Sequence, residues 1–304
     1  MNLPKFVEMI EVCPRDGFQN IHDLIPFDTK VAVIKQLATA GYQRIEICSF
    51  VSPKAIPQMA DAVEVVASTR DVLKSSGVKT AALVPNARGV ETAVACGIDE
   101  LTYVISVSEK HNMANVKRTP EESMDEFKAL IGRYGDKVRF RLSLATALGC
   151  PFGEEIRTER VLEMARFGFE LGCEEVMIAD TVGMANPVRV SALMTALVHA
   201  YGPDKFIMHL HDTRGLALAN TLAAMQLGLH KFESAAAGLG GCPFAPGAAG
   251  NVASEDVLNM LTEMGVETGV NADALNEAVM LIREGVHAPI VSHMAGLYKK
   301  SPCV

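Results

Sequence analysis

The sequence predicts an α/β protein built as a (β/α)8 TIM barrel, and three observations support this. Short runs rich in β-branched residues alternate with longer helical patterns along the whole chain, as in a parallel sheet built from βα units. Eight such strands can be assigned, the number that closes this barrel. The main alternative, an open doubly wound sheet, usually carries G-x-G-x-x-G after its first strand, whereas this chain has Pro14-Arg15-Asp16-Gly17 there.

The elements follow in order along 304 residues, of which 49% are hydrophobic, enough to bury a large core. The predicted strands are Phe6–Val12, Arg44–Ser49, Thr80–Val84, Leu101–Val107, Val138–Ala145, Glu175–Ala179, Phe206–His211 and Lys231–Ala235. Apolar residues spaced by three to four predict helices with one buried face at Thr29–Ala40, Thr158–Leu171, Val188–His199 and Leu216–Leu227. A further helix at Asn271–Glu284 follows the eighth unit. We therefore expect residues 1–304 to form one catalytic barrel domain with an added C-terminal helix in an extension from about residue 265 to 304.

Charge and cysteine content exclude several classes of protein. The formal net charge of −8 argues against nucleic acid or an anionic membrane as a partner. The seven cysteines contain no C-x-x-C pair and are odd in number, so they predict neither a disulfide framework nor a zinc ribbon. Glu8 and Glu11 interrupt the first apolar run, which is unlike a signal peptide, and no stretch has the roughly 18 apolar residues of a membrane span. These features predict a cytoplasmic protein.

Polar residues gather at the ends of the predicted strands, where a TIM barrel has its active site. His209 and His211 lie two apart at the end of the seventh strand, so both face the same way and can bind one divalent ion. Arg15-Asp16 follows the first strand, Asp180 ends the sixth and Asn251 closes the loop after the eighth. Taken singly, each has a structural alternative: an ion pair for the first, a helix cap for Asp180 and a turn for Asn251.

A carboxylate inside a strand and a glycine-rich loop are further candidates for the site, and each also has a structural alternative. Glu46 lies inside a strand, where a buried carboxylate must be paired or must bind a metal. The loop Gly238–Gly250 is rich in glycine and contains one thiol, Cys242. It is either a flexible connection, a phosphate cradle, or a closing loop that delivers the thiol. The oxygen and nitrogen ligands Asp16, His209, His211 and Asn251 favour Mg²⁺ or Mn²⁺ over a thiolate-bound zinc ion.

Several motifs resemble the 3-hydroxy-3-methylglutaryl-CoA lyase family of metal-dependent TIM-barrel lyases. They occur in the family's order over nearly the whole chain: Glu11–Asn20, Ile45-Glu46 with Ser49–Lys54, Leu148–Pro151, Asp180–Gly183, His209–Thr213, and Gly238–Asn251 followed by Glu255-Asp256.

The resemblance implies an acyl-CoA substrate, a place in leucine degradation and a homodimer or larger homo-oligomer. It implies that Asp16, His209, His211 and Asn251 hold the cation, with His209 also in the catalytic set. Arg15 is expected at the thioester oxygen, Cys242 in proton transfer, and Glu46 and Asp180 near the substrate hydroxyl. The CoA phosphates need basic partners, for which we predict Lys54 and Arg88 in strand-end loops.

The sequence departs from the family pattern near the predicted substrate site. Ile21 and His22 follow Gln19-Asn20, where a Glu is common. The alternatives are therefore a lyase for citramalyl-CoA or a longer 3-hydroxy-3-alkylglutaryl-CoA, a condensing synthase, and an acyl-CoA binding protein without activity. Cys303 resembles a redox-active terminal cysteine of some animal lyases, but a single terminal thiol is more often incidental.

Overall fold

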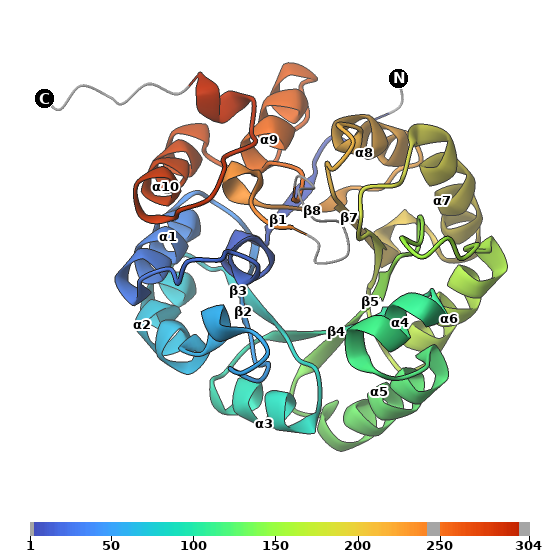
Figure 1. The fold of residues 1–304 in the computed structure, drawn as a ribbon. Coiled ribbons are helices and arrows are strands. Elements are labelled where there is room, and N and C mark those ends of the chain that lie inside the picture. The colour runs from blue at the N-terminus through green and yellow to red at the C-terminus, as the bar shows by residue number, and fades with distance from the viewer. Residues whose placement is uncertain (1–2, 242–249, 298–304) are drawn as a thin grey trace, which may run out of the picture.

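The computed structural model describes residues 3–241 and 250–297, and its centre is a closed barrel of eight parallel strands in the order β1 to β8. Figure 1 looks down the barrel and shows the helices as an outer ring. The strands are β1 (Glu8–Glu11), β2 (Arg44–Ser49), β3 (Lys79–Leu83), β4 (Glu100–Ser106), β5 (Arg139–Ala145), β6 (Val176–Asp180), β7 (Phe206–Leu210) and β8 (Lys231–Ser234). The barrel closes by pairing β1 with β8, with Met9 opposite Phe232. The predicted fold class is confirmed.

Helices cover the outside of this barrel. They are α1 (Phe27–Thr39), α2 (Ala62–Ser75), α3 (Ala87–Ala95), α4 (Glu109–Val116), α5 (Pro120–Tyr134), α6 (Thr158–Glu170), α7 (Pro187–Tyr201), α8 (Ala217–Met225), α9 (Ser254–Glu263) and α10 (Ala272–Gly285). Local sequence explains where they begin: Thr119 and Glu122 form a capping box at α5, where Pro120 takes the first helical position. Apolar residues between strands and helices form one buried core.

The C-terminal helix α10 packs beside α1, and Figure 1 shows the two next to each other. The backbone N–H of Asn271 donates to the carbonyl oxygen of Ala40 at 2.7 Å. Gly41 adopts φ +91°, and a Cβ there would lie 2.4 Å from the carbonyl oxygen of Gly269. The segment before α10 is thus held against the end of α1 by a contact that only glycine allows.

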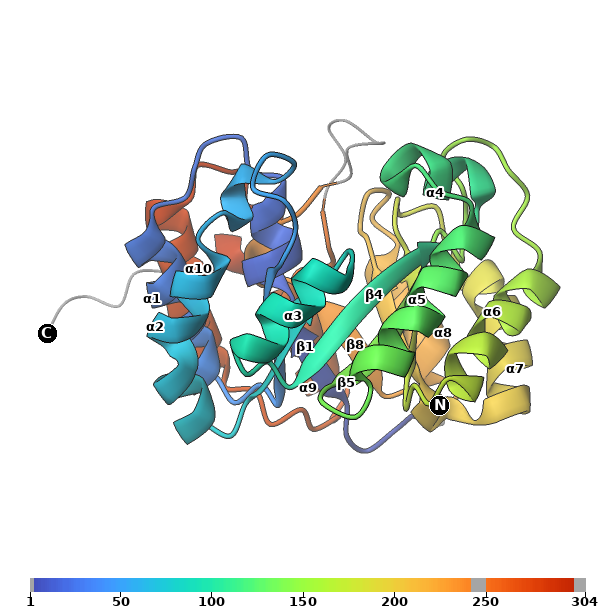
Figure 2. The same cartoon turned by 90° about the horizontal axis from the view of Figure 1, so that it is seen from below.

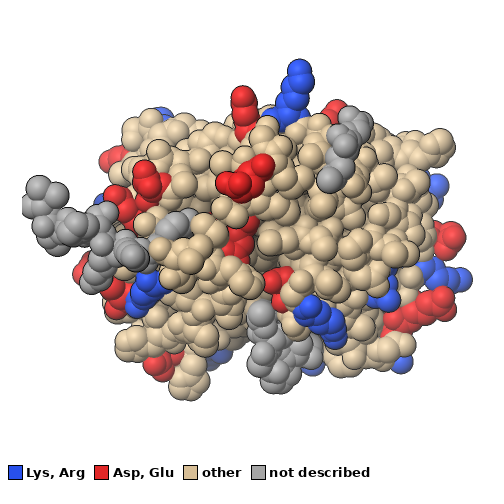
Figure 3. Space-filling view, turned by 90° about the horizontal axis from the view of Figure 1, so that it is seen from above, with Lys and Arg blue, Asp and Glu red and all other residues tan. Residues whose placement is uncertain are grey.

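The loops that follow the strands lie at one end of the barrel, the upper end in Figure 2. There, β1 runs directly into η1 (Cys13–Gly17), a single π-helical turn. None of the described helices has both the length and the apolar character needed to cross a bilayer. On the flank of the molecule seen in Figure 3, acidic and basic side chains are interspersed.

Candidate active site

Three predicted metal ligands converge at the mouth of the barrel. Asp16 comes from η1, His209 from β7, and His211 follows β7 immediately. The Nε2 atoms of the histidines are 3.1 Å apart, and Asp16 Oδ2 lies 3.7 Å from that of His211 and 4.0 Å from that of His209. Their potential ligand atoms all lie within 4.8 Å of one another, and all three residues are buried. We call this group the triad.

Asn251, the fourth predicted ligand, lies beside the triad. Asn251 pairs with His211 in an isolated antiparallel bridge, and Val252 N–H donates to the carbonyl oxygen of Leu210 at 3.0 Å. The Asn251 amide nitrogen donates to Asp16 Oδ2 at 2.7 Å and to the Leu239 carbonyl oxygen at 3.0 Å. The structure therefore places Asn251 next to the carboxylate, with the amide nitrogen rather than the amide oxygen turned toward Asp16.

The electrostatics of the triad fit a divalent cation. Burial alone would raise the pKa of Asp16, but Arg15 and the two histidines outweigh burial and hold that pKa far below its ordinary value, so the carboxylate is ionised. His211 Nδ1 is buried and has no hydrogen-bond partner among the described residues, while the Nε2 atoms of both histidines face each other. One carboxylate and two imidazoles are a donor set for a divalent ion.

Arg15 lies between two carboxylates at the edge of the triad. Its Nε donates to Glu46 Oε2, and its Nη1 donates to Asp16 Oδ1. The residue is 6% exposed and lines a cavity of about 540 Å³, which the two histidines also line. A guanidinium held at two points beside a cavity is oriented before any ligand arrives.

Glu46 and Asp180, which the sequence predicts near the substrate hydroxyl, both contact other parts of the chain. Glu46 is fully buried and contacts Arg15. Asp180 accepts hydrogen bonds from Met184 N–H at 2.8 Å and Ala185 N–H at 3.0 Å, one on each oxygen. These contacts hold the turn after β6, whereas the N-cap of α7 is Asn186.

Sequence reasoning missed Glu233 in β8. Its Oε2 lies 2.8 Å from Nδ1 of His209 and orients that ring so that Nε2 points to the triad. Burial alone would lower the pKa of His209, but this contact outweighs burial and raises it. Glu233 lies in a predicted strand and is buried, so the argument that singled out Glu46 would have found it too.

The predicted CoA-binding residues lie just outside the cavity. Lys54 and Arg88 are both exposed, whereas their neighbours Ala55 and Asn86 line it. Lys54 lies in the loop after β2, and Arg88 lies in the first turn of α3. Arg118, after α4, also lines the cavity. Cys242 and Cys303 lie outside the described residues, so their predicted roles stay predictions from sequence.

Comparisons with known proteins agree with this geometry. A family model described as HMGL-like matches residues 6–282. "Hydroxymethylglutaryl-CoA lyase YngG" of Bacillus subtilis is 39% identical over 303 residues, covering 99% of this chain and 100% of the relative. The mitochondrial hydroxymethylglutaryl-CoA lyase of Rattus norvegicus is 39% identical over 294 residues, covering 96% of this chain and 90% of the relative.

Solved structures give the same result. The crystal structure of the Bacillus subtilis HMG-CoA lyase superposes with a TM-score of 0.94 at 39% identity, over 98% of this chain and 99% of that one. An HMG-CoA lyase from Acinetobacter baumannii, solved in complex with coenzyme A and 3-methylmalate, superposes with a TM-score of 0.92 at 37% identity, over 99% of this chain and 97% of that one.

Proposed function

This chain belongs to the HMGL-like family, and from that premise we propose that it is a carbon-carbon lyase that cleaves 3-hydroxy-3-methylglutaryl-CoA to acetyl-CoA and acetoacetate. The observation that carries the proposal is the buried triad of Asp16, His209 and His211 beside Arg15, at the wall of a cavity of about 540 Å³. Two full-length relatives named as this lyase support the substrate class.

The first barrier in this reaction is removal of the proton from a tertiary hydroxyl. Such a hydroxyl has a pKa of about 16, so forming its anion near neutral pH costs roughly 12 kcal/mol. We propose that Asp16, His209, His211 and Asn251 hold Mg²⁺ or Mn²⁺. When bound, a divalent cation stabilises negative charge on the hydroxyl oxygen and orients the substrate.

Breaking the bond between C2 and C3 then moves negative charge to the thioester oxygen. Arg15 is the cationic side chain that we place there, because it lines the cavity and is adjacent to the triad. Glu46 and Asp16 hold its guanidinium at two points, so little reorganisation is needed as the charge develops. In this assignment Glu46 acts through Arg15 rather than at the hydroxyl.

The enolate of acetyl-CoA finally takes up a proton at carbon. Cys242 is the donor that we propose from the sequence. We further propose one catalytic domain with a C-terminal extension, an acyl-CoA substrate, assembly into a homo-oligomer, a cytoplasmic location and a role in leucine degradation. Lys54, in the loop after β2, and Arg88, in the first turn of α3, are proposed to reach the CoA phosphates, because both residues are exposed and near residues that line the cavity.

Metal removal tests the proposed function. Protein treated with EDTA and then freed of the chelator should release no acetyl-CoA from 3-hydroxy-3-methylglutaryl-CoA, and added Mg²⁺ or Mn²⁺ should restore the release. The measurement is acetyl-CoA formed per unit time, with citramalyl-CoA and a longer 3-hydroxy-3-alkylglutaryl-CoA as parallel substrates. Faster cleavage of either parallel substrate would change the substrate assignment, and full activity after complete metal removal would refute the metal-dependent reaction.

A further inference from the structure

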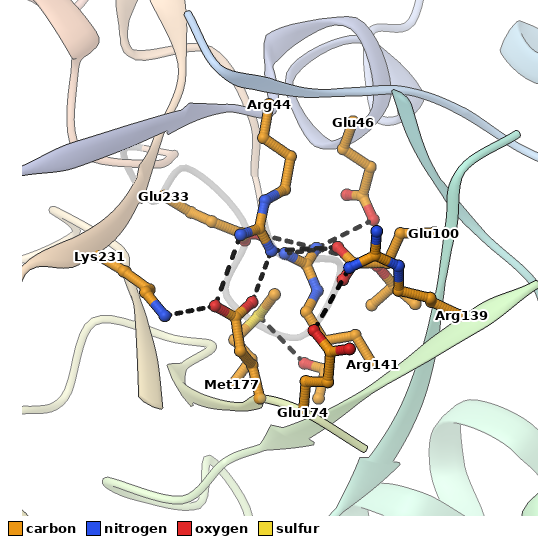
Figure 4. A network of polar contacts seen from close by, with 12 residues as sticks. Arg44, Glu46, Glu100, Arg139, Arg141, Glu174, Met177, Lys231 and Glu233 are labelled. Atoms are coloured by element: carbon orange, nitrogen blue, oxygen red, sulfur yellow. Dashed lines mark hydrogen bonds and ion pairs between the residues drawn. The ribbon is translucent and has the colours of Figure 1, made fainter. Parts of the chain in front are cut away.

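One buried arginine lies below the triad and links both parts of the proposed site. Arg141 is on β5, and its side chain has no exposed surface. Its Nη2 lies 2.9 Å from Glu233 Oε1, 2.9 Å from Thr102 Oγ1 and 3.8 Å from Glu46 Oε1. Figure 4 shows this guanidinium among carboxylates from several strands.

Three carboxylates lie near Arg141: Glu46, Glu233 and Glu100, whose Oε2 is 3.6 Å from Nη1 of Arg141. The first two also contact a residue of the site. Glu233 uses Oε2 for His209 and turns Oε1 to Arg141. Glu46 uses Oε2 for Arg15, and its Oε1 is the atom nearest Arg141. Two series of contacts therefore start at the Arg141 guanidinium. One passes through Glu233 to His209, a proposed metal ligand, and the other passes through Glu46 to Arg15, the proposed thioester contact.

The Glu46 and Glu233 side chains have no exposed surface, so water cannot solvate their charge and a buried cation must do so. An unpaired buried carboxylate is costly, so loss of the buried cation would displace the carboxylate and alter its contact with the neighbouring residue. Glu233 Oε2 lies 2.8 Å from Nδ1 of His209 and can accept a hydrogen bond from it, which turns Nε2 of His209 toward His211 and Asp16.

We infer that Arg141 is a positioning residue that fixes His209 through Glu233 and Arg15 through Glu46. This inference rests on the proposed function, since it assigns Arg141 a role at the metal site and at the thioester contact of that reaction. It goes beyond that function by coupling the two: a change at one buried side chain on β5 should alter both metal binding and turnover.

A second buried arginine offers a matched control. Arg44 on β2 forms ion pairs with Glu8 at 3.1 Å, Glu100 at 3.1 Å and Glu175 at 2.6 Å. It belongs to the same polar network seen in Figure 4. Arg44 shares Glu100 with Arg141, but its ion pairs within the described chain include neither Glu46 nor Glu233, the two carboxylates that contact the site. If burial of an arginine were all that mattered, changes at Arg44 and Arg141 would have the same effect.

The test compares Arg141→Met, Arg141→Lys, Arg44→Lys and Asp16→Asn with the wild-type chain. The first readout is the affinity for Mn²⁺ without substrate, from the free-ion signal in electron paramagnetic resonance. We expect Arg141→Met to bind Mn²⁺ about 10-fold to 100-fold more weakly, as for other changes behind a metal ligand. Arg141→Lys keeps the charge but lacks the planar fork, so we expect a loss of about threefold to 10-fold.

Turnover at saturating Mn²⁺ is the second readout. Arg141→Met should lower kcat by about 10-fold or more while KM changes by less than about threefold, since the residue does not touch substrate. Arg44→Lys should keep Mn²⁺ affinity and kcat within about twofold of wild type, even where thermal unfolding shows lower stability.

Two results would overturn the inference: Mn²⁺ affinity and kcat unchanged in a folded Arg141→Met chain, or losses in Arg44→Lys as large as those in Arg141→Lys. If Arg141→Met does not fold, unchanged Mn²⁺ affinity and kcat in Arg141→Lys would also overturn the inference. Asp16→Asn distinguishes failure of the proposed metal site from failure of the inference about Arg141. If it binds Mn²⁺ like wild type, the proposed metal site and the inference both fail; if it binds weakly while Arg141 variants bind normally, only the inference fails.

Discussion

Replacing Arg15 by lysine is expected to lower kcat by about 100-fold or more, while substrate binding changes only modestly. The guanidinium contacts Glu46 and Asp16 with separate nitrogen atoms and still lines the cavity. A lysine ammonium is a single point of charge and cannot keep both carboxylate contacts while stabilising the thioester oxygen. Steady-state kinetics at saturating Mn²⁺ and varied substrate provide the measurement.

Arg118→Lys is the matched control for this prediction. Arg118 lines the same cavity, but its side chain is 41% exposed and pairs with Glu126 rather than with the triad. We expect its kcat to stay within about threefold of wild type, because it lies away from the bond that breaks. A kcat for Arg15→Lys within that same range would remove the role assigned to Arg15.

Asp16→Asn is expected to weaken Mn²⁺ binding by about 100-fold and to lower kcat by about 1000-fold or more. The change is nearly isosteric and removes the only carboxylate of the triad, leaving two imidazoles that carry no negative charge. The substitution also removes the carboxylate that contacts Nη1 of Arg15 and accepts a hydrogen bond from the Asn251 amide. Mn²⁺ titration and steady-state kinetics of the same preparation measure both effects.

Asp212→Asn serves as the control for charge near the site. Asp212 follows His211 directly and accepts from the N–H of Ala217 at 2.8 Å, a contact that an asparagine oxygen can retain. We expect its Mn²⁺ affinity within about threefold of wild type, because general loss of a nearby charge is a weak effect. Equal losses in Asp16→Asn and Asp212→Asn would contradict ligation by Asp16.

The residues that the sequence could locate are those whose position follows from topology alone. Parallel strands bring their carboxyl ends to one rim, so Asp16 after β1, His209 and His211 at β7, and Asn251 beyond β8 could be expected to meet. The structure brings these four side chains together. Closure of the barrel could be predicted in the same way, from the number and spacing of apolar runs.

The remaining assignments depended on side-chain direction, which strand spacing does not fix. Glu46 contacts Arg15 and Asp180 contacts two backbone N–H groups, so a carboxylate at a strand end need not face the cavity. Glu233 and Arg141 were missed because their proposed roles depend on the residues that they contact across the barrel. Residues on β5 and β8 meet only through the barrel interior. Buried charge inside a predicted strand was the available signal for both.

The central claim is that Asp16, His209 and His211 bind one cation together, and pulsed electron paramagnetic resonance of the Mn²⁺-loaded chain tests it most directly. We predict one bound Mn²⁺ per chain, with couplings to two imidazole nitrogens. His209→Ala and His211→Ala should each remove one of these couplings. A bound Mn²⁺ without any nitrogen coupling, or two imidazole couplings that persist in either histidine variant, would contradict the account.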